Sequence, residues 1–119
     1  MLSTRQGGSV SNAQQFNDEI HLKVLDIIDE QPQISQRELS RQLNVSLGKV
    51  NYCLKALLDK GLLKANNFKN SKNKRAYIYV LTPKGIEEKT LLTAKFLKYK
   101  MAEFEVLKQE IADLKQRLN

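Results

Sequence analysis

A cluster of polar residues suited to molecular recognition lies between positions 46 and 55. It combines hydrogen-bond donors, a small residue and an aromatic ring, in the order Ser46, Gly48, Lys49, Asn51, Tyr52 and Lys55. On a helix these positions would share one outward face, and no acidic side chain follows until Asp59. Phosphates, and the base edges in a DNA major groove, present mainly acceptors, so this face favours nucleic acid as its partner.

Catalytic and metal chemistry have little support in the sequence. The chain contains one histidine, His21, and one cysteine, Cys53, so neither residue has a second ligand of its own type for a zinc site. There is no Gly-rich phosphate loop and no nucleophile beside a base, and the scattered acids read as solvated helix faces. We therefore expect no enzyme, no metal and no cofactor. We also expect Cys53 to be a small buried residue.

The cluster would be positioned by two short helices, of which the first is predicted over 36–43. Ser35 and Glu38 have the spacing of a capping box, in which the Glu38 carboxylate returns to the Ser35 amide. Arg37 lies on this helix and is included among the predicted DNA contacts. Asn44 suits the break that follows, because its short side chain tolerates a left-handed backbone.

The second helix is predicted over 47–60. Ser46 is its candidate N-cap and Gly61 its stop signal. Its apolar stripe consists of Val50, Leu54, Leu57 and Leu58. Two helices joined so closely pack at an angle and form a helix-turn-helix unit, in which the second helix is the recognition helix for the major groove.

The pattern then changes to that of two strands, 62–68 and 75–81, around a polar loop. Together they predict a β-hairpin whose tip, 69–75, is basic. Its four cationic residues are Lys69, Lys72, Lys74 and Arg75. A helix, a helix-turn-helix unit and a basic hairpin follow one another in a winged helix domain, and the hairpin, or wing, could reach the DNA backbone or the minor groove.

The helix after the wing is the longest expected element. Thr82 as N-cap and Pro83 at the first helical position give a strong start signal, and the helix that follows would span roughly 50 Å. Apolar residues recur along it, mostly at heptad spacing: Leu97, Met101, Phe104, Leu107, Ile111, Leu114 and Leu118. So long a helix cannot pack wholly on a small domain, so we expect a coiled coil with a second copy. The alternative is a return onto the domain's own first helix.

The expected fold class is therefore mainly α with a small β-hairpin: a winged helix-turn-helix domain followed by a long C-terminal coiled-coil helix. Its first helix is predicted from about residue 12 or 17 to residue 30. The expected division is a flexible N-terminal arm over 1–15, a DNA-binding domain over 16–84 and a dimerisation helix over 85–119.

Charge is concentrated where this organisation requires it. The net charge is +7, and eleven of the twenty basic residues but only two of the thirteen acids fall between residues 35 and 84. Such a distribution is typical of a surface that binds nucleic acid. The sequence shows no signal peptide and no apolar run long enough to cross a membrane, so we expect a cytoplasmic protein without a membrane partner.

Two segments, SLGKVNYCLKAL and NFKNSKNKRAY, resemble the winged helix-turn-helix of MarR-type transcriptional regulators. More narrowly, nearly the whole chain after residue 15 resembles the small MarR-type regulators associated with exopolysaccharide gene clusters. The resemblance implies a bacterial repressor or activator of envelope polysaccharide genes that binds double-stranded DNA as a homodimer. It places Ser46, Lys49, Asn51 and Tyr52 on the recognition helix, and Lys72, Lys74 and Arg75 on the wing.

The chain departs from ordinary MarR proteins at its N-terminal end, which is short and mostly polar. Those proteins dimerise through long helices at both ends, and their sensory ligand usually lies between the dimerisation and DNA-binding parts. The sequence therefore leaves open both the shape of the dimer and whether a small-molecule effector exists. Two other functions also stay open. The winged helix and coiled coil could form a protein–protein interaction module for an acidic partner, or the domain could read left-handed DNA or double-stranded RNA by shape.

Overall fold

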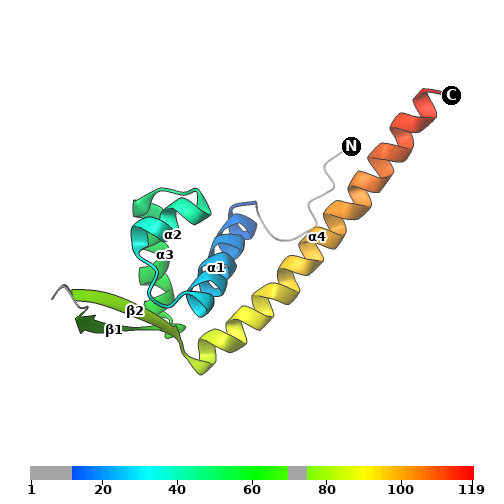
Figure 1. The fold of residues 1–119 in the computed structure, drawn as a ribbon. Coiled ribbons are helices and arrows are strands. Elements are labelled where there is room, and N and C mark those ends of the chain that lie inside the picture. Colours follow the sequence, from blue (N-terminus) through cyan, green and yellow to red (C-terminus); the bar gives the residue numbers. More distant parts are fainter. Residues whose placement is uncertain (1–11, 70–74) are drawn as a thin grey trace.

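The structure is a computed structural model that describes residues 12–69 and 75–119. Its elements follow one another as α1 (Asn12–Glu30), α2 (Gln36–Leu43), α3 (Leu47–Asp59), β1 (Leu63–Lys69), β2 (Arg75–Leu81) and α4 (Pro83–Arg117) (Figure 1). This order confirms the predicted fold class, which is mainly helical with one hairpin and a long C-terminal helix. Helix α1 begins inside the segment predicted as an arm, and residues 1–11 lie outside the described residues.

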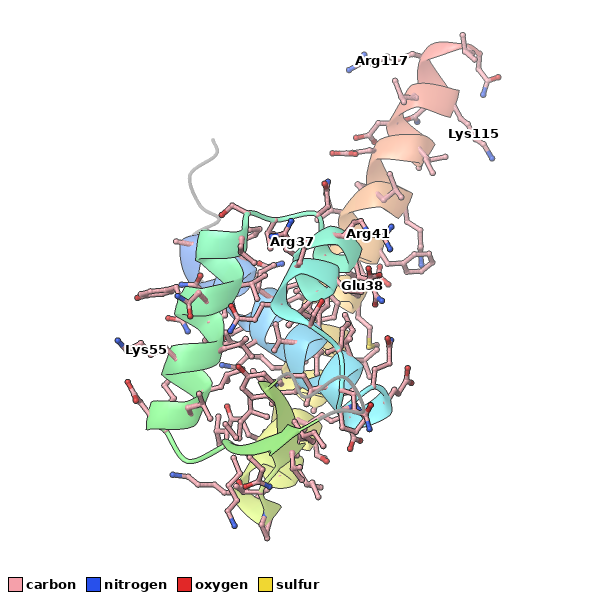
Figure 2. All side chains as sticks on the ribbon, turned by 60° about the vertical axis from the view of Figure 1, so that its left-hand side comes forward. Arg37, Glu38, Arg41, Lys55, Lys115 and Arg117 are labelled. Atoms are coloured by element: carbon pink, nitrogen blue, oxygen red, sulfur yellow. The ribbon has the colours of Figure 1, made fainter. Side chains whose placement is uncertain are left out.

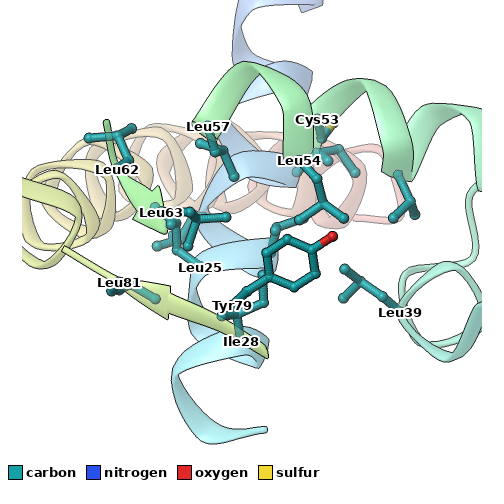
Figure 3. Close-up of a cluster of buried hydrophobic side chains, with 14 of the residues drawn as sticks. Leu25, Ile28, Leu39, Cys53, Leu54, Leu57, Leu62, Leu63, Tyr79 and Leu81 are labelled. Carbon is teal, nitrogen blue, oxygen red and sulfur yellow. The ribbon is translucent and has the colours of Figure 1, made fainter. Parts of the chain in front are cut away.

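Helix α1 is the central element of the domain. Figure 1 shows α2 and α3 on one side of it and α4 on the other. Val24 and Leu25 are fully buried on α1 and pack in one apolar cluster with Leu54 and Leu57 of α3 (Figure 3). Each such side chain contributes about 1.5–3 kcal/mol by leaving water, so this cluster fixes the position of α3 on the domain.

The helix-turn-helix unit forms as its local signals predict. The Ser35 hydroxyl accepts a hydrogen bond from the Glu38 amide at 3.0 Å, and Asn44 has the left-handed φ of 57°. The Ser46 hydroxyl accepts from the Lys49 amide, also at 3.0 Å, and caps α3. Gly61 follows α3 with a φ of 74°, which costs a glycine little.

One detail of the predicted capping box is wrong. The Glu38 carboxylate, expected to return to the Ser35 amide, instead accepts from the Arg41 guanidinium at 2.7 Å and from the Gln42 amide at 3.2 Å. The Arg41 hydrogen bond is the main cause that lowers the pKa of Glu38. A charged donor one turn further along the helix therefore replaces the backbone amide as the partner of this carboxylate.

Strands β1 and β2 pair antiparallel, with Leu63 opposite Leu81 and Lys69 opposite Arg75. The base of this hairpin is anchored in the core by buried Leu63, Tyr79 and Leu81 (Figure 3). The segment between α1 and α2 runs beside β2, where the Tyr79 amide donates to the Pro32 carbonyl at 3.2 Å. The wing thus projects from a fixed base, although residues 70–74 of its tip lie outside the described residues.

Helix α4 has two parts with different surroundings. Its first part lies along α1, with Leu92 buried and Phe96 packed against the core. Lys95 and Lys89 form ion pairs with carboxylates of α1. Every residue from Lys100 onward is exposed, and this outer part projects away from the domain (Figure 1). The first turns of the predicted dimerisation helix therefore belong to the packed domain.

Candidate nucleic-acid interface

The outward and inward faces of α3 separate as the sequence predicts. Val50, Cys53, Leu54 and Leu57 face the core and are at most 1% exposed. Burial also raises the pKa of the Cys53 thiol. The opposite face consists of the predicted recognition residues, namely the exposed Ser46, Gly48, Asn51, Tyr52 and Lys55, with half-buried Lys49. The structure therefore brings these residues together on one accessible helix face.

Figure 2 shows Lys55 pointing away from α3 into solvent. Tyr52 is 69% exposed, so its ring and its hydroxyl are both accessible to a partner. An exposed phenol beside exposed amide and ammonium groups can donate to phosphates or contact bases. This face is thus free to enter a groove of complementary chemistry.

Lys49 is held more firmly than the other members of this face. Its ammonium lies 5.6 Å from the ring centroid of Phe16 and 5.7 Å from that of Tyr52. It also donates to the Asn17 side-chain oxygen at 3.4 Å. Phe16 and Asn17 belong to α1, so two helices share this lysine.

Gly48 lies near the start of α3 with open space around it. A Cβ atom at this position would meet only the Ser46 hydroxyl oxygen, at 4.0 Å. The packing of the domain therefore gives no reason for a glycine here, and the backbone of this first turn is accessible from outside.

Two arginines of α2 differ in their availability. Arg41 is committed to Glu38, whereas Arg37 is exposed and lies on the same helix (Figure 2). On the wing, the backbones of Lys69 and Arg75 are paired in the strand register. Lys72 and Lys74 lie outside the described residues, so their placement stays a prediction.

Sequence reasoning missed two polar residues of α1 with specific roles. Asn17 contacts Lys49, and Asp18 is 9% exposed although the acids were expected to be solvated. The Asp18 carboxylate lies 3.3 Å from the Lys95 ammonium and accepts from the Tyr99 hydroxyl at 3.3 Å. Burial, with the Asp18 charge adding to it, raises the pKa of Tyr99.

The predicted dimerisation residues form a second accessible surface, which we call the α4 seam. They are between 45% and 88% exposed in the single chain: Leu97, Met101, Phe104, Leu107, Ile111, Leu114 and Leu118. Monomeric proteins rarely expose so many contiguous apolar side chains. A further open hollow of about 510 Å³ lies between Gln15 at the start of α1 and Val106 on α4.

Within 12–69 and 75–119, no three or more His, Cys, Asp or Glu side chains gather as metal ligands would. In the same part of the chain, no helix has both the length and the apolar character needed to cross a membrane.

Comparison with known proteins defines the class. A family described as winged helix-turn-helix DNA-binding matches residues 17–64, which extend from α1 to the start of β1. No curated protein matches the sequence. The chain thus has a winged helix-turn-helix fold.

Solved structures agree with that fold over most of the chain. A PadR-like transcriptional regulator from Bacillus cereus has a TM-score of 0.68 at 21% identity, covering 79% of this chain and 96% of that one. FabT from Streptococcus pneumoniae, in complex with DNA, has a TM-score of 0.51 at 24% identity, with coverages of 82% and 73%. Lactococcus lactis ZitR has a TM-score of 0.55 at 19% identity, with coverages of 96% and 82%. The resemblance to MarR-type regulators and the exopolysaccharide association stay predictions.

Proposed function

We propose that this protein is a sequence-specific regulator of transcription that binds double-stranded DNA as a homodimer. Helix α3 would enter the major groove, and the basic wing, 69–75, would lie on the backbone or in the minor groove. The observation that carries this proposal is the outward face of α3, where six recognition residues gather and the first acidic residue is Asp59, at the end of the helix. A face of donors on a projecting helix matches the acceptor-rich surface of duplex DNA.

The homodimer is supported by the α4 seam. Its apolar side chains are exposed in the part of the chain that the structure describes, and the outer part of α4 projects away from the domain. A second α4 with the same heptad pattern would bury this surface by knobs-into-holes packing. Two domains joined in this way would present two copies of α3 to half-sites about one helical turn apart, or a multiple of that distance.

The proposed target genes follow from the sequence resemblance. The resemblance to exopolysaccharide-associated regulators suggests envelope polysaccharide genes as targets. FabT, a structural neighbour, was solved in complex with DNA, which agrees with DNA as the ligand of this fold.

Binding to a labelled duplex of random sequence, measured by fluorescence anisotropy at increasing salt, tests the DNA-binding part. We expect the logarithm of the association constant to fall linearly with the logarithm of the salt concentration, because bound phosphates release counterions. Selection of genomic fragments by the protein would then identify the operator and test the link to polysaccharide genes. If the protein does not bind DNA even at low salt, the proposal is wrong and an acidic protein is favoured as the partner.

A further inference from the structure

Helix α1 contributes to the surface that we assign to DNA, although it lies outside the helix-turn-helix unit. Phe16 is 50% exposed, and its ring lies against the Lys49 ammonium rather than in the core. Asn17, the next residue, accepts a hydrogen bond from the same ammonium. Two consecutive residues of α1 thus hold one side chain of α3.

Lys55 is a lysine of α3 that lacks such contacts with α1. It lies further along the same outward face and is exposed, and within the described part of the chain no aromatic ring, amide or carboxylate contacts its ammonium. The two lysines therefore differ in their contacts with α1, although both belong to the predicted recognition face. This difference provides an internal control for the role of those contacts.

Holding a lysine has a physical consequence for binding. A lysine side chain has many rotamers, and ordering them on binding costs free energy. An aromatic ring attracts the ammonium through its quadrupole without neutralising its charge, and an amide oxygen accepts one of its three protons. The Lys49 ammonium is therefore ordered before a ligand arrives and still carries its full positive charge.

We propose that Phe16 and Asn17 are positioning residues, which hold the Lys49 ammonium in place to contact a DNA phosphate. This inference rests on the proposed function, because it assigns the ligand of Lys49 as DNA. It adds two residues of α1 to the DNA-binding apparatus, although neither needs to touch DNA. A preordered point charge is well suited to a phosphate oxygen.

The same turn of α1 is itself firmly fixed. Asp18, adjacent to Asn17, is bound to Lys95 and Tyr99 of α4. Phe16 and Asn17 are therefore mounted on a turn that the body of the protein holds in place, which a positioning role requires. A residue that orders another must first be ordered itself.

A double-mutant cycle on DNA affinity tests this inference. Phe16→Leu removes the ring but keeps an apolar side chain, and we expect about a 3-fold loss of affinity for a random duplex. The same change in a Lys49→Ala background should have no effect, because the lysine it positions is absent. In a Lys55→Ala background the 3-fold loss should persist, since Lys55 has no contact with Phe16 among the described residues.

Phe16→Tyr is the matched conservative variant, and it should retain the wild-type affinity because the ring face remains. Asn17→Ala should act in the same direction as Phe16→Leu and also depend on Lys49. In Lys49→Ala, the slope of the logarithm of the association constant against the logarithm of the salt concentration should be reduced by about the contribution of one phosphate contact. If Phe16→Leu acted through a general loss of structure in α1, it would lower DNA affinity equally in the Lys49→Ala and Lys55→Ala backgrounds.

The outcomes separate the two ideas. If the wild-type protein binds the duplex but Phe16→Leu weakens it equally with and without Lys49, the positioning role is wrong and the DNA-binding function stands. If the wild-type protein binds no duplex, the proposed function fails and the assignment of Lys49 to phosphate fails with it. The contact itself is tested by NMR. The Lys49 side-chain protons should show a ring-current shift that Phe16→Leu reduces and Phe16→Tyr retains, and no change in Phe16→Leu would overturn the inference.

Discussion

The Leu62 carbonyl oxygen occupies the space in which a side chain at Gly85 would begin, so α4 passes directly against the turn that follows α3. The surrounding hydrogen bonds fasten the same junction. The Thr82 hydroxyl donates to the Gly61 carbonyl at 2.6 Å and accepts from the Gly85 amide at 3.0 Å. The start of the proposed dimerisation helix is thereby fixed on the end of the proposed recognition helix. In a dimer this junction would help set the separation of the two α3 helices.

Gly85→Ala should destabilise the domain severely. Its Cβ atom would collide with the Leu62 backbone, which cannot move aside as a flexible side chain can. Overpacking of this kind typically costs 1–3 kcal/mol, and we expect a loss of about 3 kcal/mol in the free energy of unfolding. Urea denaturation followed by circular dichroism would measure it. A variant as stable as the wild type would contradict the close approach of Leu62 and Gly85.

Gly48→Ala should separate stability from binding. The open space at this position accepts a methyl group, and alanine favours a helix over glycine by about 0.5–1 kcal/mol, so the free energy of unfolding should be unchanged or higher. DNA affinity should fall if the first turn of α3 approaches the duplex closely. Urea denaturation and anisotropy on the same protein would measure the two effects. Undiminished affinity would place Gly48 away from the DNA.

Asn51→Ala should weaken binding to the selected operator more than to random DNA. An asparagine amide can make two hydrogen bonds to an adenine edge, and such a contact discriminates by about 1–3 kcal/mol. Replacing both Lys72 and Lys74 with alanine should instead weaken binding to every sequence and flatten its salt dependence, since lysines on a wing neutralise phosphates. Titration of both duplexes across salt would measure these effects. Equal losses on the two duplexes would exclude Asn51 from base recognition.

Charge placed on the α4 seam should prevent dimerisation. Leu107→Glu combined with Leu114→Glu puts two like charges at positions that a second α4 would cover, and burying them unpaired would be costly. Light scattering should show a monomer, with the α-helical content of the domain retained. Leu91→Glu is the matched control, because Leu91 is exposed on α4 but lies outside the seam. A wild-type monomer, or a dimer unaffected by the double change, would contradict the proposed pairing.

The stability of the domain should fall on mild acidification because of His21. Burial is the main cause that lowers the pKa of His21 from 6.5; the nearby Lys60 charge also lowers it, and Asp18 partly opposes the shift. The unfolded chain therefore takes up a proton at higher pH than the folded chain does. The resulting stability is present above about pH 6.5 and is lost as the pH falls through the folded pKa. His21→Gln should flatten the free energy of unfolding between about pH 7.5 and 5.5, as measured by urea denaturation. A steep dependence that persists in this variant would assign the effect to other groups.

Much of the candidate interface follows from local patterns. The helical spacing of Val50, Leu54 and Leu57 determines which side of α3 is buried, so it also determines that Asn51 and Lys55 face outward. Capping is equally local, because a serine hydroxyl and the amide three residues later meet wherever a helix begins. The structure confirms these relationships, and the sequence could predict them because they depend on neighbouring residues.

Other features depend on residues distant in the sequence. Asn17 and Lys49 are 32 positions apart, and their contact exists only once α1 and α3 are packed together. Phe16 fits the apolar pattern of α1, yet it lies beyond the edge of the core, where its ring meets an ammonium. Asp18 resembles any surface acid in the sequence, and only the passage of α4 beside α1 buries it.

The sequence by itself determined the order of the elements and their apolar faces, because these depend on side-chain periodicity. Short-range capping also predicted the starts of α2, α3 and α4, whereas the start of α1 stayed open. The sequence also determined where the positive charge is concentrated. The tertiary structure alone decided how α1, α3 and α4 meet: that Gly85 must lack a side chain, that Lys49 is held from α1, and that the outer part of α4 is left uncovered. These features arise from the close packing of distant segments, whose relative positions the overall fold sets and no local pattern records.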